Sequence, residues 1–372
     1  MASETETPAT AIGPRAVPWL SRAAPAVHGS FDASAAARFG LREADVLDFS
    51  ANGNVLGPPP GVAAALAQVD LARYPDRGAS DLRAALARRH ALPESSIVPG
   101  NGSTELIWSI ARAFLAPGDS TLVVGPTYGE YAAASAACGA RIETCSAIHP
   151  GSGLNAELFA RAMGQTPPHV AWLCHPNNPT GTTLPLDLLA QLAQAFPDTL
   201  FVVDEAYVTL CQGVSSAMSL IGGGNVVVLR SMTKDAALAG LRIGYAVATE
   251  RVADAVRRMA PPWSVSSFAQ AAALAALSDL DHIEHAQEAV AASRAHLTDG
   301  LRRLGFNPYP SVANFVLVPV GDGCRVTLAL LERGFAVRDC TSFGFPDCIR
   351  IGVRTISDQD RLLAALDGIR DG

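Results

Sequence analysis

The chain has 372 residues, of which 49% are hydrophobic and 17% charged, with a formal net charge of −7 at pH 7; its pI is about 5.6 and its mean hydropathy +0.21. The arginines are dispersed among acidic residues, so the sequence lacks the basic patch that binding to nucleic acid or an acidic membrane requires. No apolar run of 18 residues predicts a transmembrane helix, and seven widely spaced cysteines without a CxxC pair argue against a disulfide framework or a structural zinc site.

The first 27 residues are polar and interrupted by proline, and they lack the apolar core of a signal peptide. We therefore expect a flexible leader on a cytoplasmic protein whose partners are small molecules. Between about residues 80 and 255, short β-branched runs alternate with helical patterns, which predicts a parallel sheet covered by helices. The predicted strands are 121–124, 140–145, 170–174, 200–204, 225–230 and 243–248. A helix is expected over 103–116, with Ser103 and Thr104 as its caps.

The pattern changes in the second part of the chain. An Ala-rich helical stretch over about 265–303 precedes strand patterns within 314–320, 335–339 and 348–353. Strands and helices in this mixture predict a smaller α+β domain. We divide the chain into a leader at 1–27, an N-terminal segment at 28–70 that packs with the small domain, a large domain at 71–285 and a small domain at 286–372.

One residue stands out among the 28 lysines and arginines, because Lys234 is the single lysine. An arginine stays protonated in proteins, whereas a lysine amine can lose its proton and condense with an aldehyde. Composition alone does not separate a chemical role from a leftover surface lysine. The motifs around Lys234 distinguish these two interpretations.

Four motifs lie at or after predicted strands, where open α/β sheets bind their ligands. They are GNGSTE (100–105), HPNNPTG (175–181), VVDEAY (202–207) and SMTKDAALAGLRIGY (231–245). Each alone fits an ordinary turn or loop, but the ordered set resembles the class I/II aminotransferases, which are fold-type-I enzymes dependent on pyridoxal 5′-phosphate (PLP). The resemblance spans about residues 28–370. It implies an α/β fold, with a large domain built on a mostly parallel seven-stranded sheet between helices, and a smaller α+β domain.

The resemblance also implies roles for individual residues. Lys234 is implied to form the Schiff base with PLP and to move the Cα proton. Asp204 is implied to face the pyridine nitrogen, where a carboxylate keeps that nitrogen protonated. The other implied cofactor ligands are Asn178 and Tyr207 at the phenolic oxygen, Tyr128 on the ring face, and Ser103, Thr104, Ser231 and Arg242 at the phosphate. Tyr74 is implied to reach the phosphate of a neighbouring subunit, which predicts a homodimer with shared active sites.

The substrate side is read from the same resemblance. Arg350 matches the family arginine that binds a substrate α-carboxylate. Segments HGS (28–30), DFSANGNVLGPP (48–59), PPWSVSS (261–267) and VRDCTSFG (337–344) resemble threonine-phosphate decarboxylase, a relative of histidinol-phosphate aminotransferase. That likeness implies a substrate pocket formed by His28, Gly29, Asn52, Asn178 and Arg338. His28 and Arg338 would face a substrate phosphate; alternatively, His28 lies at a domain edge and Arg338 pairs near Asp339.

Four positions depart from the family pattern. Ser30 and the segment Asn54-Val55-Leu56-Gly57 replace a glycine and the usual NPLG of the decarboxylase, and His175 replaces the first Asn of NPNNPTG. Asp235 places an acid directly after the lysine, where an apolar or small residue is more usual. None of these changes removes an implied cofactor ligand, but all lie toward the substrate.

We predict a PLP-dependent enzyme acting at the α-carbon of a small amino acid, most similar to a threonine-phosphate decarboxylase. An aminotransferase of the histidinol-phosphate type and an oxygen-dependent oxidase or monooxygenase stay open, because the fold does not define which bond breaks. A non-catalytic sensor attached to a DNA-binding domain is disfavoured by the short leader. No metal site is predicted, since His282 and His285 lack a third ligand, and the glycines at 222–224 predict a turn.

Overall fold

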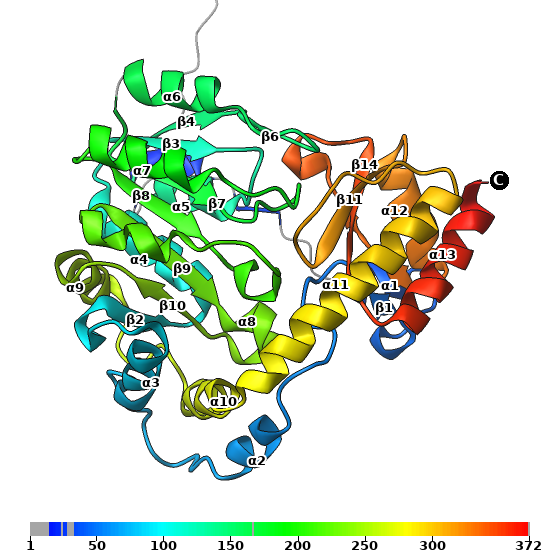
Figure 1. Ribbon diagram of the computed structural model, residues 1–372, viewed down its shortest axis with the longest axis horizontal. Coiled ribbons are helices and arrows are strands. Elements are labelled where there is room, and N and C mark those ends of the chain that lie inside the picture. The colour runs from blue at the N-terminus through cyan, green and yellow to red at the C-terminus, as the bar shows by residue number, and fades with distance from the viewer. Residues whose placement is uncertain (1–14, 24, 28–32, 166, 371–372) are drawn as a thin grey trace, which may run out of the picture.

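The computed structural model describes residues 15–23, 25–27, 33–165 and 167–370. Figure 1 shows a large sheet with helices on both faces and a smaller sheet beside it, joined by the long helix α11. This arrangement confirms the predicted α/β architecture with a large and a smaller part. In the described part of the chain, no helix is both long and apolar enough to cross a bilayer.

The large sheet has seven strands in the order β2-β10-β9-β8-β7-β3-β4. β10 runs antiparallel to both of its neighbours, while β9, β8, β7, β3 and β4 pair in parallel. The strands are β2 Ile97–Gly100, β3 Ser120–Val124, β4 Arg141–Cys145, β7 Val170–Cys174, β8 Leu200–Asp204, β9 Val226–Ser231 and β10 Gly244–Val247. Six of them match predicted strands to within one residue at both ends. The strand β2 was missed, because its four residues include Pro99 and give too short a pattern.

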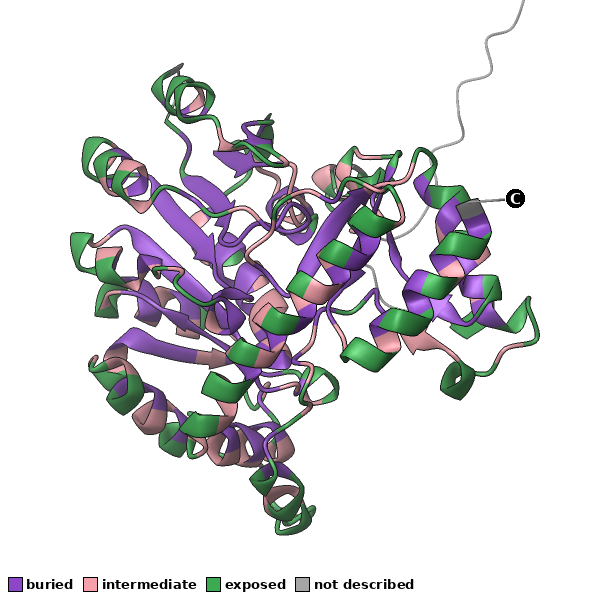
Figure 2. Ribbon diagram, turned by 45° about the vertical axis from the view of Figure 1, so that its right-hand side comes forward, coloured by how far each residue is buried: buried purple, intermediate pink, exposed green. Residues whose placement is uncertain are grey.

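The central strands are buried on both faces, as Figure 2 shows. Two separate apolar clusters cover the faces, which explains why these strands are continuous apolar runs rather than alternating ones. One face carries α2 Gly61–Ala67, α3 Ser80–His90, α6 Ala156–Gln165, α7 Leu186–Ala195 and α10 Ser267–Leu277. The other carries α4 Gly102–Phe114, α5 Glu130–Ala137 and α9 Glu250–Met259.

Helix α4 begins differently from the sequence prediction. The helix starts at Gly102 after Asn101, and no side chain caps its first turn from the N-cap position. Ser103 and Thr104 lie inside that turn and are not its caps. Glu105 reaches back instead, and its Oε2 accepts the Asn101 amide at 2.7 Å. Ser103 and Thr104 both line the cavity described below.

The Ala-rich stretch predicted over 265–303 is two helices, α10 and α11 (Leu280–Arg303). The Asp279 carboxylate accepts the His282 amide at 3.1 Å and caps α11. The Ser278 hydroxyl donates to the Ala275 carbonyl at 2.7 Å and closes α10. Short polar side chains that bind nearby backbone groups favour caps over helix interiors, which accounts for the break.

The smaller sheet has the order β11-β14-β13, with β11 Phe315–Pro319, β14 Cys348–Gly352 and β13 Arg338–Asp339. Helices α11, α12 (Gly323–Glu332) and α13 (Ile356–Arg370) pack with it around one apolar cluster. Strand β1 (Leu47–Asp48) pairs in parallel with β12 (Phe335–Ala336), and α1 (Ala33–Ala37) packs nearby. Helix α2 packs instead against α10. The segment before residue 70 is therefore divided between the two parts. Strand β1 pairs with the small part, whereas α2 packs with the large part.

Part of the expected leader lies on the large sheet's helical layer. The 3₁₀ helix Pro18–Arg22 packs against α5, and the Trp19 indole donates to the Ala137 carbonyl at 3.0 Å. A Cβ at Gly139 would lie 3.1 Å from the Trp19 ring, so glycine permits this approach. The segment continues to Val27, at the edge of the cavity described next.

Candidate active site

A cavity of about 520 Å³ lies between the large and the small sheet. Cys174, Asp204 and Ser231 line it, and these are the last residues of β7, β8 and β9. Arg338 and Arg350 of the small sheet line the same cavity. Parallel strands end at one edge of a sheet, so residues far apart in sequence converge there.

Lys234 lies on the short helix α8 (Met232–Asp235), directly after β9, and lines the cavity. Burial lowers the pKa of its amine to about 8, and the positive charges of Arg350 and Arg242 act in the same direction. About half of the amine is therefore unprotonated at pH 8, whereas a lysine in water stays almost fully protonated at that pH. An amine of this kind is suited to attack an aldehyde.

Asp204 is buried at the end of β8 and has two hydrogen-bond partners. The Tyr131 hydroxyl donates to Oδ2 at 2.8 Å, and the Ala206 amide donates to Oδ1 at 3.0 Å. Burial nevertheless raises the pKa of Asp204 to about 6. A cationic ring nitrogen beside this carboxyl group would offset the cost of burying its charge.

Sequence reasoning singled out Tyr128 and missed Tyr131, three residues further along the chain. Tyr131 is fully buried on α5, and its ring stacks on Trp172 with 5.4 Å between centroids and planes 3° apart. Tyr128 also lines the cavity, with its hydroxyl oxygen 3.5 Å from the Thr104 Oγ1. The only signal in the sequence was proximity, since Tyr131 lies three residues after Tyr128 in the segment that follows the predicted strand 121–124.

Four predicted phosphate ligands line the cavity: Ser103, Thr104, Ser231 and Arg242. The first two lie in the first turn of α4, where unpaired backbone amides and the positive end of the helix dipole favour an anion. Gly102 has φ +75°, and a Cβ there would lie 2.5 Å from Arg242 Nη2. Glycine thus leaves room for the guanidinium group in front of the helix. Thr233, which sequence reasoning did not name, contacts Ser231 with 2.7 Å between hydroxyl oxygens.

Arg350 connects the small sheet to the residues at the centre of the cavity. Its Nη1 donates to Asn178 Oδ1 at 2.5 Å, and its Nη2 donates to the Ser50 carbonyl at 2.7 Å. The side chain is 5% exposed, and its Nε has no hydrogen-bond partner in the described part of the chain. Asn52 donates to the Tyr207 hydroxyl at 3.5 Å in the same region. All four predicted residues, Asn52, Asn178, Tyr207 and Arg350, line the cavity.

Arg338 lies beside Arg350 on the neighbouring strand, with the two Cα positions paired in register. Its Nη2 donates to the Val27 carbonyl at 2.8 Å and to Ser342 Oγ at 2.7 Å. Burial and the charge of Arg350 lower the pKa of Arg338. Two guanidinium groups therefore reach one cavity, which favours an anionic substrate. His28 and Gly29 lie outside the described residues.

Tyr74 does not line the cavity. Its side chain is 83% exposed, and its ring packs on Trp263 with 5.3 Å between centroids. Its proposed role at a neighbouring subunit's phosphate stays a prediction.

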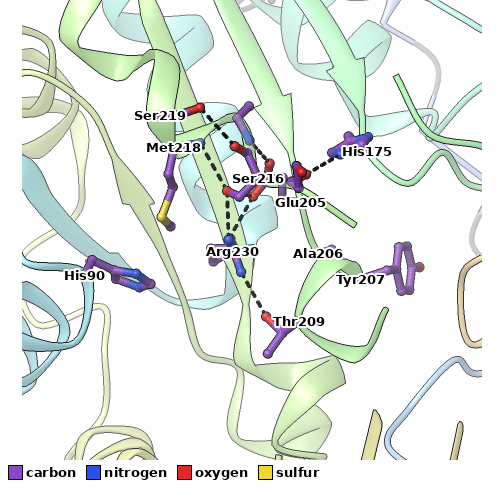
Figure 3. A network of polar contacts seen from close by, with 12 residues as sticks. His90, His175, Glu205, Ala206, Tyr207, Thr209, Ser216, Met218, Ser219 and Arg230 are labelled. Carbon is purple, nitrogen blue, oxygen red and sulfur yellow. Dashed lines mark hydrogen bonds and ion pairs between the residues drawn. The ribbon is translucent and has the colours of Figure 1, made fainter. Parts of the chain in front are cut away.

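His175 joins the loop after β7 to a more distant segment. Its Nδ1 accepts the Leu184 amide at 3.0 Å, so its Nε2 carries the proton and donates to the Ser215 carbonyl at 2.9 Å. His175 lies next to the buried polar network of Glu205, Ser216 and Arg230 in Figure 3. The substitution of the family's usual Asn is thus accommodated by two backbone hydrogen bonds, and His175 does not line the cavity.

The residue set fits PLP. The cavity combines an amine with a lowered pKa, a buried carboxyl group and an anion site at a helix start, which match the cofactor's aldehyde, ring nitrogen and phosphate. His282, a candidate in the weak metal pattern, contacts the Gly57 carbonyl with 3.0 Å between Nε2 and oxygen. Among the described residues, no group of three or more His, Cys, Asp or Glu side chains is placed to hold a metal ion.

Comparison with known proteins agrees with this geometry. The model of the family "Aminotransferase class I and II" matches residues 44–366. "Histidinol-phosphate aminotransferase 2" of Ralstonia nicotianae is 38% identical over 355 residues, covering 92% of this chain and 94% of the relative. The structure of histidinol-phosphate aminotransferase from Sinorhizobium meliloti in complex with pyridoxal-5′-phosphate has a TM-score of 0.84 at 28% identity, covering 96% of this chain and 98% of that one.

The structure of L-threonine-O-3-phosphate decarboxylase from Porphyromonas gingivalis has a TM-score of 0.74 at 24% identity, with coverage of 88% of this chain and 100% of that one. A likeness at this identity shows the fold alone. The sequence prediction placed the decarboxylase first and the aminotransferase second, and the comparisons favour the reverse order. That prediction relied on the substrate-side segments 28–30, 48–59, 261–267 and 337–344, because the cofactor motifs do not separate two reactions that need the same cofactor site.

Proposed function

Because the chain belongs to the class I and II aminotransferase family, whose members depend on PLP, we propose that it transfers an amino group between a phosphorylated amino compound of the histidinol-phosphate type and a 2-oxo acid. The single observation that supports the phosphorylated substrate is the pair Arg338 and Arg350 on adjacent strands of the small sheet. Both line the cavity that contains Lys234. A pair of guanidinium groups binds a phosphate or a carboxylate through paired N–H donors.

When bound, PLP supplies an aldehyde that takes up the amino group and a ring that withdraws electrons from the neighbouring carbon. In our proposal Lys234 holds the aldehyde carbon and afterwards moves the proton at the substrate carbon, which its lowered pKa permits. Asp204 holds the ring nitrogen in its protonated form. The other proposed cofactor ligands are Ser103, Thr104, Ser231 and Arg242 at the phosphate, Asn178 and Tyr207 at the ring oxygen, and Tyr128 at the ring face.

On the substrate side, Arg350 is proposed to orient the anionic group of each substrate. Its contacts with Asn178 and Ser50 hold the guanidinium plane before any substrate arrives, which reduces the entropy lost on binding. Arg338 is proposed to bind the phosphate, and Asn52 to lie beside the substrate. The Arg338 contact with the Val27 carbonyl would then be exchanged for the phosphate oxygens.

We also propose a homodimer in which Tyr74 reaches the partner's phosphate site. Leu71 and Tyr74 are 80% and 83% exposed on one loop, next to Trp263. Size-exclusion chromatography with light scattering measures the mass directly. Mixing a Lys234→Ala chain with a Tyr74→Phe chain should restore activity in part, because one of the two sites then has both residues intact.

The test of the reaction uses holoenzyme with three readouts in parallel. Histidinol phosphate with 2-oxoglutarate should yield glutamate, while O-phospho-L-threonine should release no CO₂ and no substrate should consume O₂. Release of CO₂ without glutamate formation would replace the proposal with decarboxylation, and O₂ uptake would replace it with oxidation.

A variant pair tests the phosphate site. Arg338→Gln should reduce the preference for histidinol phosphate over histidinol by roughly 10- to 100-fold, as expected for a lost hydrogen bond to a charged group. Arg333→Gln removes an exposed arginine from the end of α12 and is the matched control. Equal preference in both variants would contradict the assignment of Arg338.

A further inference from the structure

The proposed reaction does not use the buried polar network around Glu205 (Figure 3). Glu205, directly after Asp204, is fully buried and accepts the Ala217 amide at 2.6 Å and the Ser216 hydroxyl at 2.7 Å. Its Oε2 pairs with Arg230 Nη2 at 3.0 Å. Three groups thus bind this carboxylate, and these bonds hold the surrounding side chains in place.

The network continues from Arg230 to the residue beside Lys234. Arg230 Nη1 donates to Thr209 Oγ1 at 3.0 Å. That bond uses a lone pair of the hydroxyl oxygen, so the hydroxyl hydrogen is available to the Asp235 carboxyl group, which lines the same second cavity as Thr209 and whose pKa the Thr209 hydroxyl lowers. An ion pair and a hydrogen bond therefore connect Glu205, the residue after Asp204, with Thr209, and Thr209 shares a cavity with Asp235, the residue after Lys234.

Helix α8, which carries Lys234, depends on outside contacts for its position. It has four residues and no side-chain cap, and a helix this short has no stability of its own. Asn54 binds one side of it, donating its amide to the Lys234 carbonyl and its Nδ2 to the Asp235 carbonyl, each at 2.9 Å. The Asp235 side chain provides the attachment to Thr209, and its Oδ1 also accepts the Ala236 amide at 2.7 Å.

We propose that Asp235 is a positioning residue for Lys234, because its carboxyl group ties α8 through Thr209 to the Arg230–Glu205 pair and so keeps the lysine amine in the cofactor cavity. This inference rests on the proposed role of Lys234 as the residue that holds PLP. It gives a function to a position where the chain departs from its family pattern. Asp235 acts through the helix and does not line the cofactor cavity.

Several charged and titratable groups lie around Asp235. It lines a second cavity of about 430 Å³ together with Arg230 of β9, Arg89 and His90 of α3, and Tyr245 of β10. Burial raises the pKa of Asp235 to about 6, while Thr209, the Ala236 amide and the two arginines favour its charged form. Burial lowers the pKa of His90 to about 4, so this histidine is neutral near pH 7.

The expected effect of releasing α8 follows from the cause of the low Lys234 pKa. Burial is its largest cause, so water that reaches the amine should raise the pKa from about 8 toward the ordinary 10.5. A rise of two pH units would reduce the unprotonated fraction at pH 8 about 50-fold.

The test exploits the single lysine of this chain. The full-length protein without cofactor is treated with formaldehyde and cyanoborohydride over a range of pH, and methylation of Lys234 is followed by mass spectrometry. The wild type should show a midpoint near pH 8. Asp235→Ala and Thr209→Val should both raise the midpoint by at least one pH unit, and in the holoenzyme both should lower kcat by at least 10-fold with a smaller change in KM.

Conservative variants separate positioning from a general loss of structure. Asp235→Asn keeps an acceptor for the Thr209 hydroxyl, and Thr209→Ser keeps the hydroxyl, so both should stay within half a pH unit of the wild type. Asp254→Asn on the exposed face of α9 is the matched control. If Asp235→Ala does not fold, the midpoints of Thr209→Val and Thr209→Ser are compared instead.

Wild-type midpoints and kcat in both Asp235→Ala and Thr209→Val would overturn the inference, as would an equal shift in Asp235→Asn and Asp235→Ala. Borohydride treatment of the wild-type holoenzyme provides the separate check on the proposed function. If PLP is not fixed on Lys234, the proposed function fails. If PLP is fixed there but the variants show no shift, only the role of Asp235 fails.

Discussion

Replacing Tyr131 by Phe removes one hydroxyl group from the carboxyl group that we assign to the ring nitrogen of PLP. The hydroxyl donates to Asp204 Oδ2 at 2.8 Å, and both residues are buried. The variant keeps the aromatic ring and its stacking on Trp172, so little apolar contact is lost. The substitution therefore tests a single hydrogen bond to a single charge.

The magnitude follows from the charge of the acceptor. A hydrogen bond to a charged group contributes about 1.5–3 kcal/mol, and its loss should raise the pKa of Asp204 further by about 1–2 units. Binding of a cationic ring nitrogen requires the charged carboxylate, whose fraction at pH 7 should fall from about nine-tenths to between about one-half and one-tenth, so the affinity for PLP near pH 7 should fall by roughly 2- to 10-fold.

The pH dependence of stability gives a second magnitude. The pKa of Asp204 is about 6 in the folded protein, against an ordinary 3.8. Between these values the folded protein keeps a proton that the unfolded chain has released, so the free energy of unfolding falls as pH rises through this window. The variant should extend the window upward, and its loss of stability should be about 1–2 kcal/mol greater at pH 8 than at pH 5.

The assay titrates protein without cofactor with PLP and follows the visible absorption band, and urea unfolding at the two pH values supplies the stability. Tyr245→Phe is the matched control, because Tyr245 is also buried and its hydroxyl oxygen lies 2.9 Å from His90 Nε2, outside the cofactor cavity. An affinity for PLP equal to that of the wild type in Tyr131→Phe would refute the reasoning, as would a stability loss that does not depend on pH.

Three further predictions concern residues at and around the cavity. Borohydride reduction of the holoenzyme should fix PLP on Lys234 alone, and Lys234→Ala should lose fixation and roughly 10²–10⁴-fold or more of the activity; label elsewhere would contradict the assignment. Gly102→Ala should weaken PLP binding about 10-fold, because φ is +75° and the new Cβ would displace the Arg242 guanidinium; unchanged affinity would remove Arg242 from the phosphate site. His175→Asn should lose the bond to Ser215 and lower the free energy of unfolding by about 1–3 kcal/mol in thermal or urea unfolding, whereas a stability equal to the wild type would show that the bond contributes nothing.

The predictions from sequence succeeded where the determinant is local. Buried parallel strands are continuous apolar runs, and the lysine motif follows such a run directly, so the strand bounds and the position of Lys234 were visible in the sequence. The cap predicted at Ser103 and the unbroken helix predicted across residue 278 were wrong for a reason that is also local. Short polar side chains form hydrogen bonds with nearby backbone groups, and hydrophobic periodicity does not reveal these bonds. The short strand β2 was missed because only its pairing with β10 defines it.

The sequence by itself determined which chemical groups are present: one lysine, an acid after a buried strand, and arginines near the C-terminus. Only the tertiary structure decided which of them meet. Tyr131 and Asp204 are 73 positions apart, and Arg350 and Asn178 are 172 apart. Such pairs form because parallel strands end at one edge and the small sheet packs against that edge. The pKa values of Lys234 and Asp204 have the same origin, since burial, the largest cause of both shifts, exists only after the two sheets have come together.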